Sequence, residues 1–208
     1  NPARVARHHR SGGMLSDLLD QIREYYLTRL VDVINDHGER DGVQVAYEVA
    51  FCDDDGEVAT EGELDLPCRA DLIVVENGEV ADSVQVDTAE MLSFDALDFV
   101  WPDTSLNVHL EPFQWNWLQL KIPADTWSGE PDWTLLRQWF LDWFQDHDPH
   151  DEELLGGVHY LSDPTLADGV WQLTIDLGSA PINAFEDLLD VVDALGAKSV
   201  ELGQFSDE

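Results

Sequence analysis

The densest group of side chains with metal-binding or acid–base chemistry lies between residues 146 and 153. It consists of two histidines and five carboxylates: Asp146, His147, Asp148, His150, Asp151, Glu152 and Glu153. Imidazole and carboxylate together suit zinc, manganese or iron, and a bound metal ion can make a hydrolytic nucleophile from water. One hypothesis is therefore a metal-dependent hydrolase that uses His147, His150 and Asp151. Pro149 interrupts the helical register that would place both histidines on one face, so a solvated acidic helix end is the alternative.

The other polar motifs favour turns or packing over catalysis. Residues 53–56 supply only the start of a calcium loop, and their Asp-Gly pair is typical of a hairpin turn. His109 and His159 are flanked by apolar residues on predicted strands, where a single histidine is more often a half-buried, hydrogen-bonded side chain than a ligand. Ser162 and Ser179 lack the glycines of a nucleophile elbow. The sequence therefore assigns no catalytic residue and no organic cofactor.

Charge sets the class of partner. The 208-residue chain has 44 acidic residues against ten lysines and arginines, which gives a formal net charge of −34. Most carboxylates therefore have no basic partner, and the charge argues against nucleic acid or an anionic membrane as a partner. Two explanations remain. Either the surface binds a basic protein, or it is adapted to a salt-rich cytoplasm. The second explanation is suggested by the composition of the chain, which resembles that of halophilic proteomes.

The leading functional hypothesis is a non-enzymatic interaction protein that binds a basic protein, as an immunity-type or nucleic-acid-mimicking inhibitor would. Such a partner would associate fast and in a salt-sensitive way. The carboxylates expected to contact it are Asp146, Asp148, Glu152, Glu153, Glu186, Asp187, Asp190 and Asp193. The metal-dependent hydrolase and a halophile-adapted domain whose acidity serves only solvation are the alternatives, and the oligomeric state stays open.

Composition predicts a folded protein despite the charge. Hydrophobic residues make up 44% of the chain and aromatic residues 10%, enough for a substantial core. No stretch approaches the roughly 18 to 20 continuous apolar residues of a membrane span, and the first residues lack an apolar signal region. We therefore expect a cytoplasmic protein. Cys52 and Cys68 are more typical of buried thiols than of a disulfide framework.

The elements that must position these residues centre on a stretch from Asn107 to Glu153, which contains six of the eight tryptophans. Its periodicity predicts a strand, a turn and a helix that begins at Pro131. The apolar alternation changes phase at residues 117–118, which predicts a bulge or a strand that changes its covered face. We expect the aromatic side chains to form core, with an aromatic groove for a partner or apolar ligand as the alternative.

The predicted class is α+β, an antiparallel sheet with helices. Residues 1–13 are a basic tail or a leader sequence, and residues 14–103 form an N-terminal module of a helix, β-hairpins and a second helix over 88–99. Residues 104–208 follow the order β, α, β, β, α, β of a ferredoxin-like plait. The boundary is expected at residues 101–103, although one continuous domain is the alternative.

Overall fold

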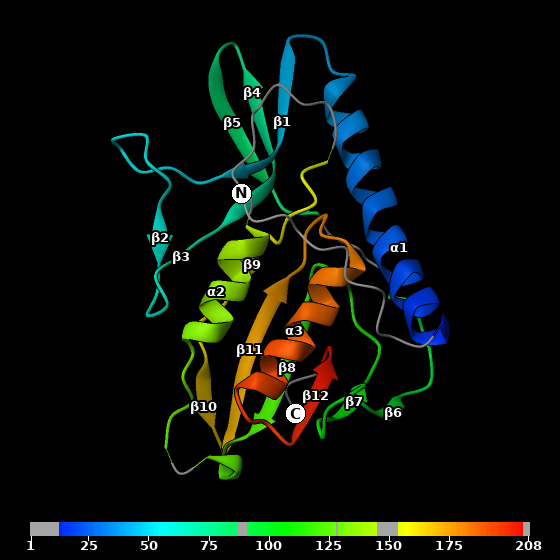
Figure 1. The fold of residues 1–208 in the computed structure, drawn as a ribbon. Coiled ribbons are helices and arrows are strands. Elements are labelled where there is room, and N and C mark those ends of the chain that lie inside the picture. Colours follow the sequence, from blue (N-terminus) through cyan, green and yellow to red (C-terminus); the bar gives the residue numbers. More distant parts are fainter. Residues whose placement is uncertain (1–12, 87–90, 128, 145–153, 206–208) are drawn as a thin grey trace, which may run out of the picture.

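The computed structural model describes residues 13–86, 91–127, 129–144 and 154–205. Within these ranges the chain forms three α-helices, a three-stranded sheet, a seven-stranded sheet and a two-stranded ribbon (Figure 1). This arrangement confirms the α+β class. None of the helices in this part of the chain combines the length and apolarity that crossing a bilayer requires.

The N-terminal part pairs one long helix with an antiparallel sheet in the order β1-β4-β5. Its elements are α1 (Gly13–Gly38), β1 (Val43–Ala50), β2 (Thr60–Glu61), β3 (Leu66–Pro67), β4 (Arg69–Glu76) and β5 (Glu79–Val84). Leu19, Ile22 and Tyr26 are buried along one stripe of α1, as the helical spacing predicts. Asn77 and Gly78 have φ values of 54° and 84°, the left-handed conformation that a two-residue hairpin turn requires. The sequence predicts a hairpin here, because Asn-Gly is the residue pair typical of a two-residue turn, and the antiparallel pairing of β4 with β5 confirms it.

The C-terminal part is a mixed sheet in the order β10-β11-β8-β12-β7-β6, with β9 paired to β11. Its strands are β6 (Leu97–Val100), β7 (Asn107–Leu110), β8 (Leu118–Pro123), β9 (Tyr160–Leu161), β10 (Thr165–Ala167), β11 (Val170–Asp176) and β12 (Ser199–Gly203). A 3₁₀ turn over Ala124–Thr126 follows β8. The helices α2 (Thr134–Trp143) and α3 (Ile182–Ala194) lie side by side on one face of this sheet (Figure 1).

The details of the ferredoxin-like plait are not confirmed. Both β11 and β12 pair antiparallel with β8, so β11, α3 and β12 form one βαβ unit with β8 inserted between its strands. The chain that leaves β8 through α2 re-enters the sheet at β9 and β10, which both pair antiparallel with β11, so β11 lies between β8 and these two short strands. The single strand that the plait has at this place is divided into two short pieces. The strands β6 and β7 extend the sheet on its other side.

The second helix predicted for the N-terminal module is wrong for the residues that the structure describes. Residues 91–96 have no regular secondary structure, and Leu97–Val100 forms β6, which pairs antiparallel with β7. The helix prediction depended on a capping pair at Asp87 and Glu90, which lie outside the described residues. Leu97 and Phe99 are two residues apart and pack against the core from one face of a strand, so cross-strand pairing overrides the local signal.

The predicted module boundary at residues 101–103 lies in the hairpin between β6 and β7. The Trp101 amide donates to the Leu106 carbonyl at 2.8 Å, and the Trp101 side chain is fully buried. One continuous apolar core includes residues of both predicted modules, such as Leu72 of β4 and Phe185 of α3.

Most of the aromatic stretch is core. Four of its tryptophans are buried: Trp115, Trp133, Trp139 and Trp143. Trp117 is 46% exposed, and its amide donates to the Gln114 carbonyl at 2.9 Å. The change in alternation at residues 117–118 therefore marks a turn before β8, neither a bulge nor a strand that changes its covered face.

Candidate functional site

Four ionisable side chains meet in the interior of the protein, and we call them the His159 cluster. Its members are Glu48 on β1, Asp71 on β4, His159 immediately before β9 and Asp176 at the end of β11. All four are buried, with at most 4% of any residue exposed. The cluster therefore draws on strands of both large sheets. A main-chain hydrogen bond of 3.0 Å from the Arg69 amide to the His159 carbonyl joins the two sheets beside it.

Glu48 enters the cluster because β1 leaves regular strand geometry at this residue. The flanking residues Tyr47 and Val49 pair with β4, whereas Glu48 has a φ of 54°. A positive φ at a non-glycine residue costs on the order of 1–3 kcal/mol and persists only where the surroundings enforce it. Here the Arg69 guanidinium donates to the Glu48 carbonyl at 2.9 Å, which holds the main chain in this conformation.

His159 bridges two carboxylates. Its Nδ1 lies 2.8 Å from Asp71 Oδ1 and its Nε2 lies 2.8 Å from Glu48 Oε1. Burial alone would lower the pKa of the imidazole, but the hydrogen bonds to Asp71 and Glu48 outweigh it and raise the pKa to about 10. Burial pushes the pKa of Glu48 upward, yet its bonds to His159 and to the Ser179 hydroxyl leave that pKa below its ordinary value.

The two oxygens of Asp71 are both engaged. Oδ1 accepts from the Tyr26 hydroxyl at 3.1 Å as well as facing His159, and Oδ2 accepts from the Val86 amide at 2.6 Å. Burial, reinforced by neighbouring carboxylates, raises the pKa of Tyr26 well above its ordinary value, so this hydroxyl stays a donor. Asp71 is thereby fixed in position by Tyr26 of α1 and by the main chain at Val86, just after β5.

Asp176 is held by its own donors. Oδ1 accepts from the Gly178 amide at 2.8 Å and Oδ2 from the Gln85 side chain at 3.0 Å. Burial, and then the nearby Asp71, raise the pKa of Asp176 to about 7 even though His159 opposes the shift. Gly178 has a φ of 54°, and a Cβ at this position would overlap the His159 ring. Only glycine lets the chain turn this close to the imidazole.

The geometry does not set up nucleophilic catalysis. The Ser179 hydroxyl donates to Glu48 Oε1, and the imidazole nitrogens of His159 are bonded to Glu48 and Asp71. A serine nucleophile would instead need its hydroxyl on the imidazole. Donor atoms of Asp71, His159 and Asp176 do lie within 4.8 Å of one another, so these three side chains could converge on a metal ion.

The group at residues 146–153 lies outside the described residues. It contains Asp146, His147, Asp148, His150, Asp151, Glu152 and Glu153. The metal site predicted at His147, His150 and Asp151 therefore stays a prediction, as do the partner contacts predicted for the other four carboxylates.

The predicted acidic face of the last helix is more covered than the sequence suggested. Glu186 is buried, whereas Asp187, Asp190 and Asp193 are half-buried. Asp190 Oδ1 accepts from the Trp101 indole at 2.8 Å. The sequence pairs Asn183 with Glu186 as the cap of this helix, but the helix begins at Ile182 and no side-chain hydrogen bond caps this end, so that prediction is wrong. Binding of a partner by these carboxylates stays a prediction.

His109 and the cysteines are simpler cases. His109 Nδ1 lies 2.7 Å from Asp98, a contact that raises the pKa of this 36% exposed imidazole, and its Nε2 lies 3.3 Å from Glu111. Its prediction as a half-buried, hydrogen-bonded side chain is confirmed. Both cysteines are free, but Cys52 is exposed and Cys68 half-buried, so the prediction that both thiols are buried is wrong.

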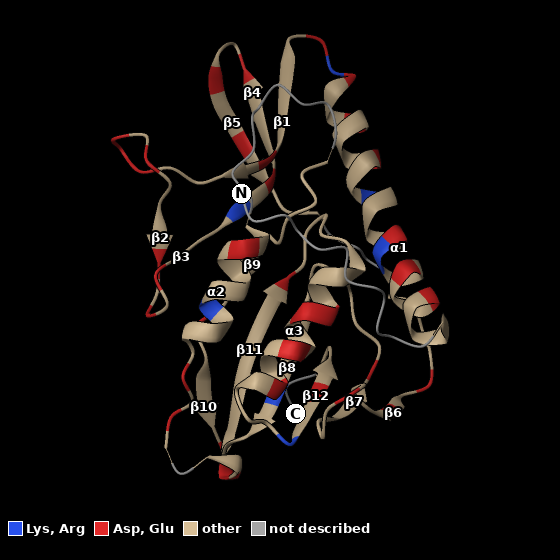
Figure 2. Ribbon diagram, viewed as in Figure 1, with Lys and Arg blue, Asp and Glu red and all other residues tan. Residues whose placement is uncertain are grey.

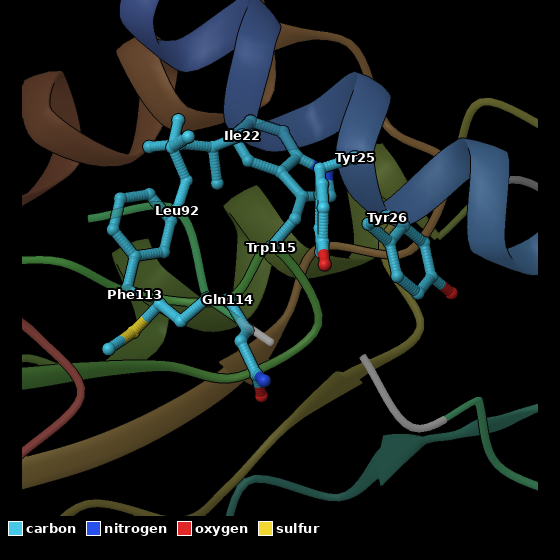
Figure 3. Close-up of a pocket in the computed structure, with 8 residues that line it drawn as sticks. Ile22, Tyr25, Tyr26, Leu92, Phe113, Gln114 and Trp115 are labelled. Carbon is cyan, nitrogen blue, oxygen red and sulfur yellow. The ribbon is translucent and has the colours of Figure 1, made fainter. Parts of the chain in front are cut away.

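Two hollows are candidate ligand sites. The first lies between α1 and the segment before β8, where Figure 3 shows Ile22 and Tyr25 of the helix close to Trp115. Its cavity volume of about 10 Å³ is hardly enough for one water molecule, against roughly 300–1,000 Å³ for a small-molecule site. The second, of about 670 Å³, is open and lies between the start of α1 and residues 94–97. Its lining combines apolar residues with the polar side chains of Asp17, Gln21 and Asp95.

Sequence reasoning missed the His159 cluster as a unit. It predicted His159 as a half-buried, hydrogen-bonded side chain on a strand, whereas this residue is hydrogen-bonded but fully buried and lies immediately before β9. A signal was present at Asp71, which stands within the apolar run from residue 70 to 75, and at Asp176 between Ile175 and Leu177. A carboxylate inside an apolar strand needs a buried partner.

Comparison with protein-family models, with curated proteins and with solved structures finds no match.

Proposed function

We propose that this chain is a non-enzymatic interaction domain that binds a basic protein through its carboxylate surface. The observation that carries the proposal is that several arginine side chains donate hydrogen bonds to main-chain carbonyls inside the fold. Arg23 donates to the Ala180 carbonyl at 2.8 Å, Arg69 to that of Glu48 at 2.9 Å and Arg137 to that of Leu64 at 2.8 Å. These bonds tie segments of the fold together, and Arg23 and Arg137 each also pair with one surface carboxylate, Glu24 and Asp65. With ten Lys and Arg against 44 Asp and Glu, most of the acidic surface is still uncompensated.

The outer surface is left strongly acidic. Figure 2 shows Asp and Glu on α1, on the β4–β5 hairpin, in the loop before β2 and on α3, with few Lys or Arg among them. Among the described residues, ion pairs at the surface join Arg40 to Glu76 at 2.7 Å, Arg23 to Glu24 at 3.5 Å and Arg137 to Asp65 at 3.7 Å. Exposed pairs of this kind contribute only about 0–1 kcal/mol. A basic protein would neutralise charges that the chain itself does not neutralise.

Association with such a partner would be accelerated by long-range attraction. A surface potential of one sign raises the association rate constant, and salt reduces this gain as the screening length shortens. The half-buried carboxylates Asp187 and Asp193 of α3 are the described candidates for the contact, because they lie on an ordered helix that would lose little entropy on binding.

The experiment starts by capturing partners at 0.05 M and 0.3 M KCl and then measures association of the purified pair. The contact variant combines Asp187→Asn and Asp193→Asn, and the control combines Asp54→Asn and Asp55→Asn in the exposed loop after β1. Each pair removes two negative charges, so both proteins change equally in net charge. We expect the α3 variant to weaken binding at least about tenfold more than the control. The absence of a basic partner at either salt concentration, or equal effects of the two variants, would contradict the proposal.

A second candidate function is favoured by the spread of the charge. The carboxylates are spread over helices, hairpins and loops in both parts of the chain (Figure 2), which suits a surface that stays solvated at high salt as well as one that binds a partner. The two candidates differ in how stability responds to molar salt.

A further inference from the structure

The His159 cluster has more negative charge than its histidine can neutralise. Glu48, Asp71 and Asp176 carry three negative charges when ionised, and a protonated His159 supplies one positive charge. The four side chains then have a net charge of −2, and the buried Arg69, whose guanidinium donates to the Glu48 carbonyl, adds one positive charge beside them, so one negative charge remains uncompensated. Burying uncompensated charge is costly, and such groups either take up a proton or bind a cation.

The cluster also has the layout of a metal centre with its supporting residues. A ligating histidine usually donates its second ring N–H to a carboxylate, which fixes the tautomer and the ring orientation. Glu48 is in that position at 2.8 Å from Nε2, and it is itself held by the Ser179 hydroxyl. Nδ1 is then the ligand, on the same side of the ring as Asp71 and Asp176.

The distances come close to those around a common ion. Ligands about 2.1 Å from an ion lie about 3.4 Å apart in a tetrahedral site and about 3 Å apart at right angles, so the 2.8 Å hydrogen bond between His159 Nδ1 and Asp71 Oδ1 lengthens by a few tenths of an ångström when an ion replaces its proton. The carboxylate of Asp176 offers the third ligand within the same 4.8 Å group. Both carboxylates keep donors from neighbouring residues, so the ligands are already oriented.

We propose that Asp71, His159 and Asp176 bind one divalent transition-metal ion, Zn²⁺ or Mn²⁺, with Glu48 orienting the imidazole. Two carboxylates and one imidazole suit these ions better than soft thiophilic metals. The ion has a structural role, because its ligands are buried and join β4 of one sheet to β11 of the other. Binding displaces the proton from His159 Nδ1, so uptake of the ion releases protons and weakens as the pH falls.

The test uses the full chain, purified without chelator and also refolded from urea with Zn²⁺, Mn²⁺ or Mg²⁺. We expect about one equivalent of Zn²⁺ or Mn²⁺ and a rise in Tm of about 5–10 °C at a hundredfold excess over Kd. Asp176→Asn should reduce the content below about a tenth of an equivalent and abolish the Tm shift. Asp98→Asn, which alters the exposed pair at His109, should bind as the unmodified chain does.

Two controls locate the ion and keep the test independent of whether the Asp176 variant folds. The double variant His147→Ala/His150→Ala should retain the ion, because those histidines are not ligands in the proposal. X-ray absorption of the zinc-loaded, unmodified chain should give a first shell of oxygen with a single imidazole. Less than about a tenth of an equivalent after refolding with either ion, loss of the ion in the double variant, or a shell with two imidazoles or sulfur would overturn the proposal.

Discussion

Replacing His159 with alanine tests whether the buried cluster stabilises the fold. The imidazole bridges Glu48 and Asp71 at 2.8 Å on each side, and none of the three is more than 4% exposed. Removing one partner from a buried ion pair costs about 3–5 kcal/mol, because the remaining charges stay buried. A domain has only about 5–15 kcal/mol of stability in total, so His159→Ala should leave the protein close to unfolding.

The control is His109→Ala, because His109 also stands between two carboxylates, Asp98 and Glu111, but on the surface. Its cost should be about 0–1 kcal/mol. Urea unfolding at pH 7, with a chelator present, measures both variants. Glu48→Gln added to His159→Ala should recover part of the loss, because it removes one uncompensated charge. If His159→Ala costs no more than His109→Ala, the cluster does not stabilise the fold and the reasoning fails.

Two further predictions concern single contacts. Gly178→Ala should lower the free energy of unfolding by more than Gly169→Ala does, because both glycines have positive φ but only Gly178 lies against the His159 ring. The backbone strain common to both variants is on the order of 1–2 kcal/mol. Urea unfolding of the two variants measures the difference. Asp98→Asn should lower the pKa of His109, since Asp98 is the main cause of its raised value. The pair at His109 therefore stabilises the fold at pH values below the ordinary histidine pKa and loses that effect as the pH rises through the raised value. NMR titration of the imidazole resonances tests this, and an unchanged pKa would contradict it.

The sequence predicted most elements whose signal is local. The first helix, the hairpin at Asn77-Gly78 and the strand predicted over residues 171–177, which forms as β11, follow from apolar periodicity and from turn residues. The failure at residues 97–100 comes from strand pairing. These residues pair with β7, which follows in the chain, and their local sequence does not indicate that pairing.

The His159 cluster shows why a site of this kind is hard to predict. Glu48 alternates with the apolar residues of β1, a pattern typical of a side chain that faces solvent, but its positive φ turns the side chain inward. Asp71 is 88 residues from His159, so only the folded sheet brings them together. A charged residue inside an apolar strand indicated burial, yet nothing in the spacing indicated which residue would be its partner.

Thermal unfolding between 0.05 and 3 M KCl tests the proposed function most directly, and it can be measured before any partner is identified. At a net charge of −34, screening should stabilise the fold as the Debye length falls from about 30 Å at 0.01 M toward about 4 Å near 0.5 M. A surface that serves a basic partner predicts that Tm rises and then reaches a plateau by about 0.5 M. A Tm that keeps rising into molar KCl would contradict the binding function and favour a surface adapted to solvation in salt.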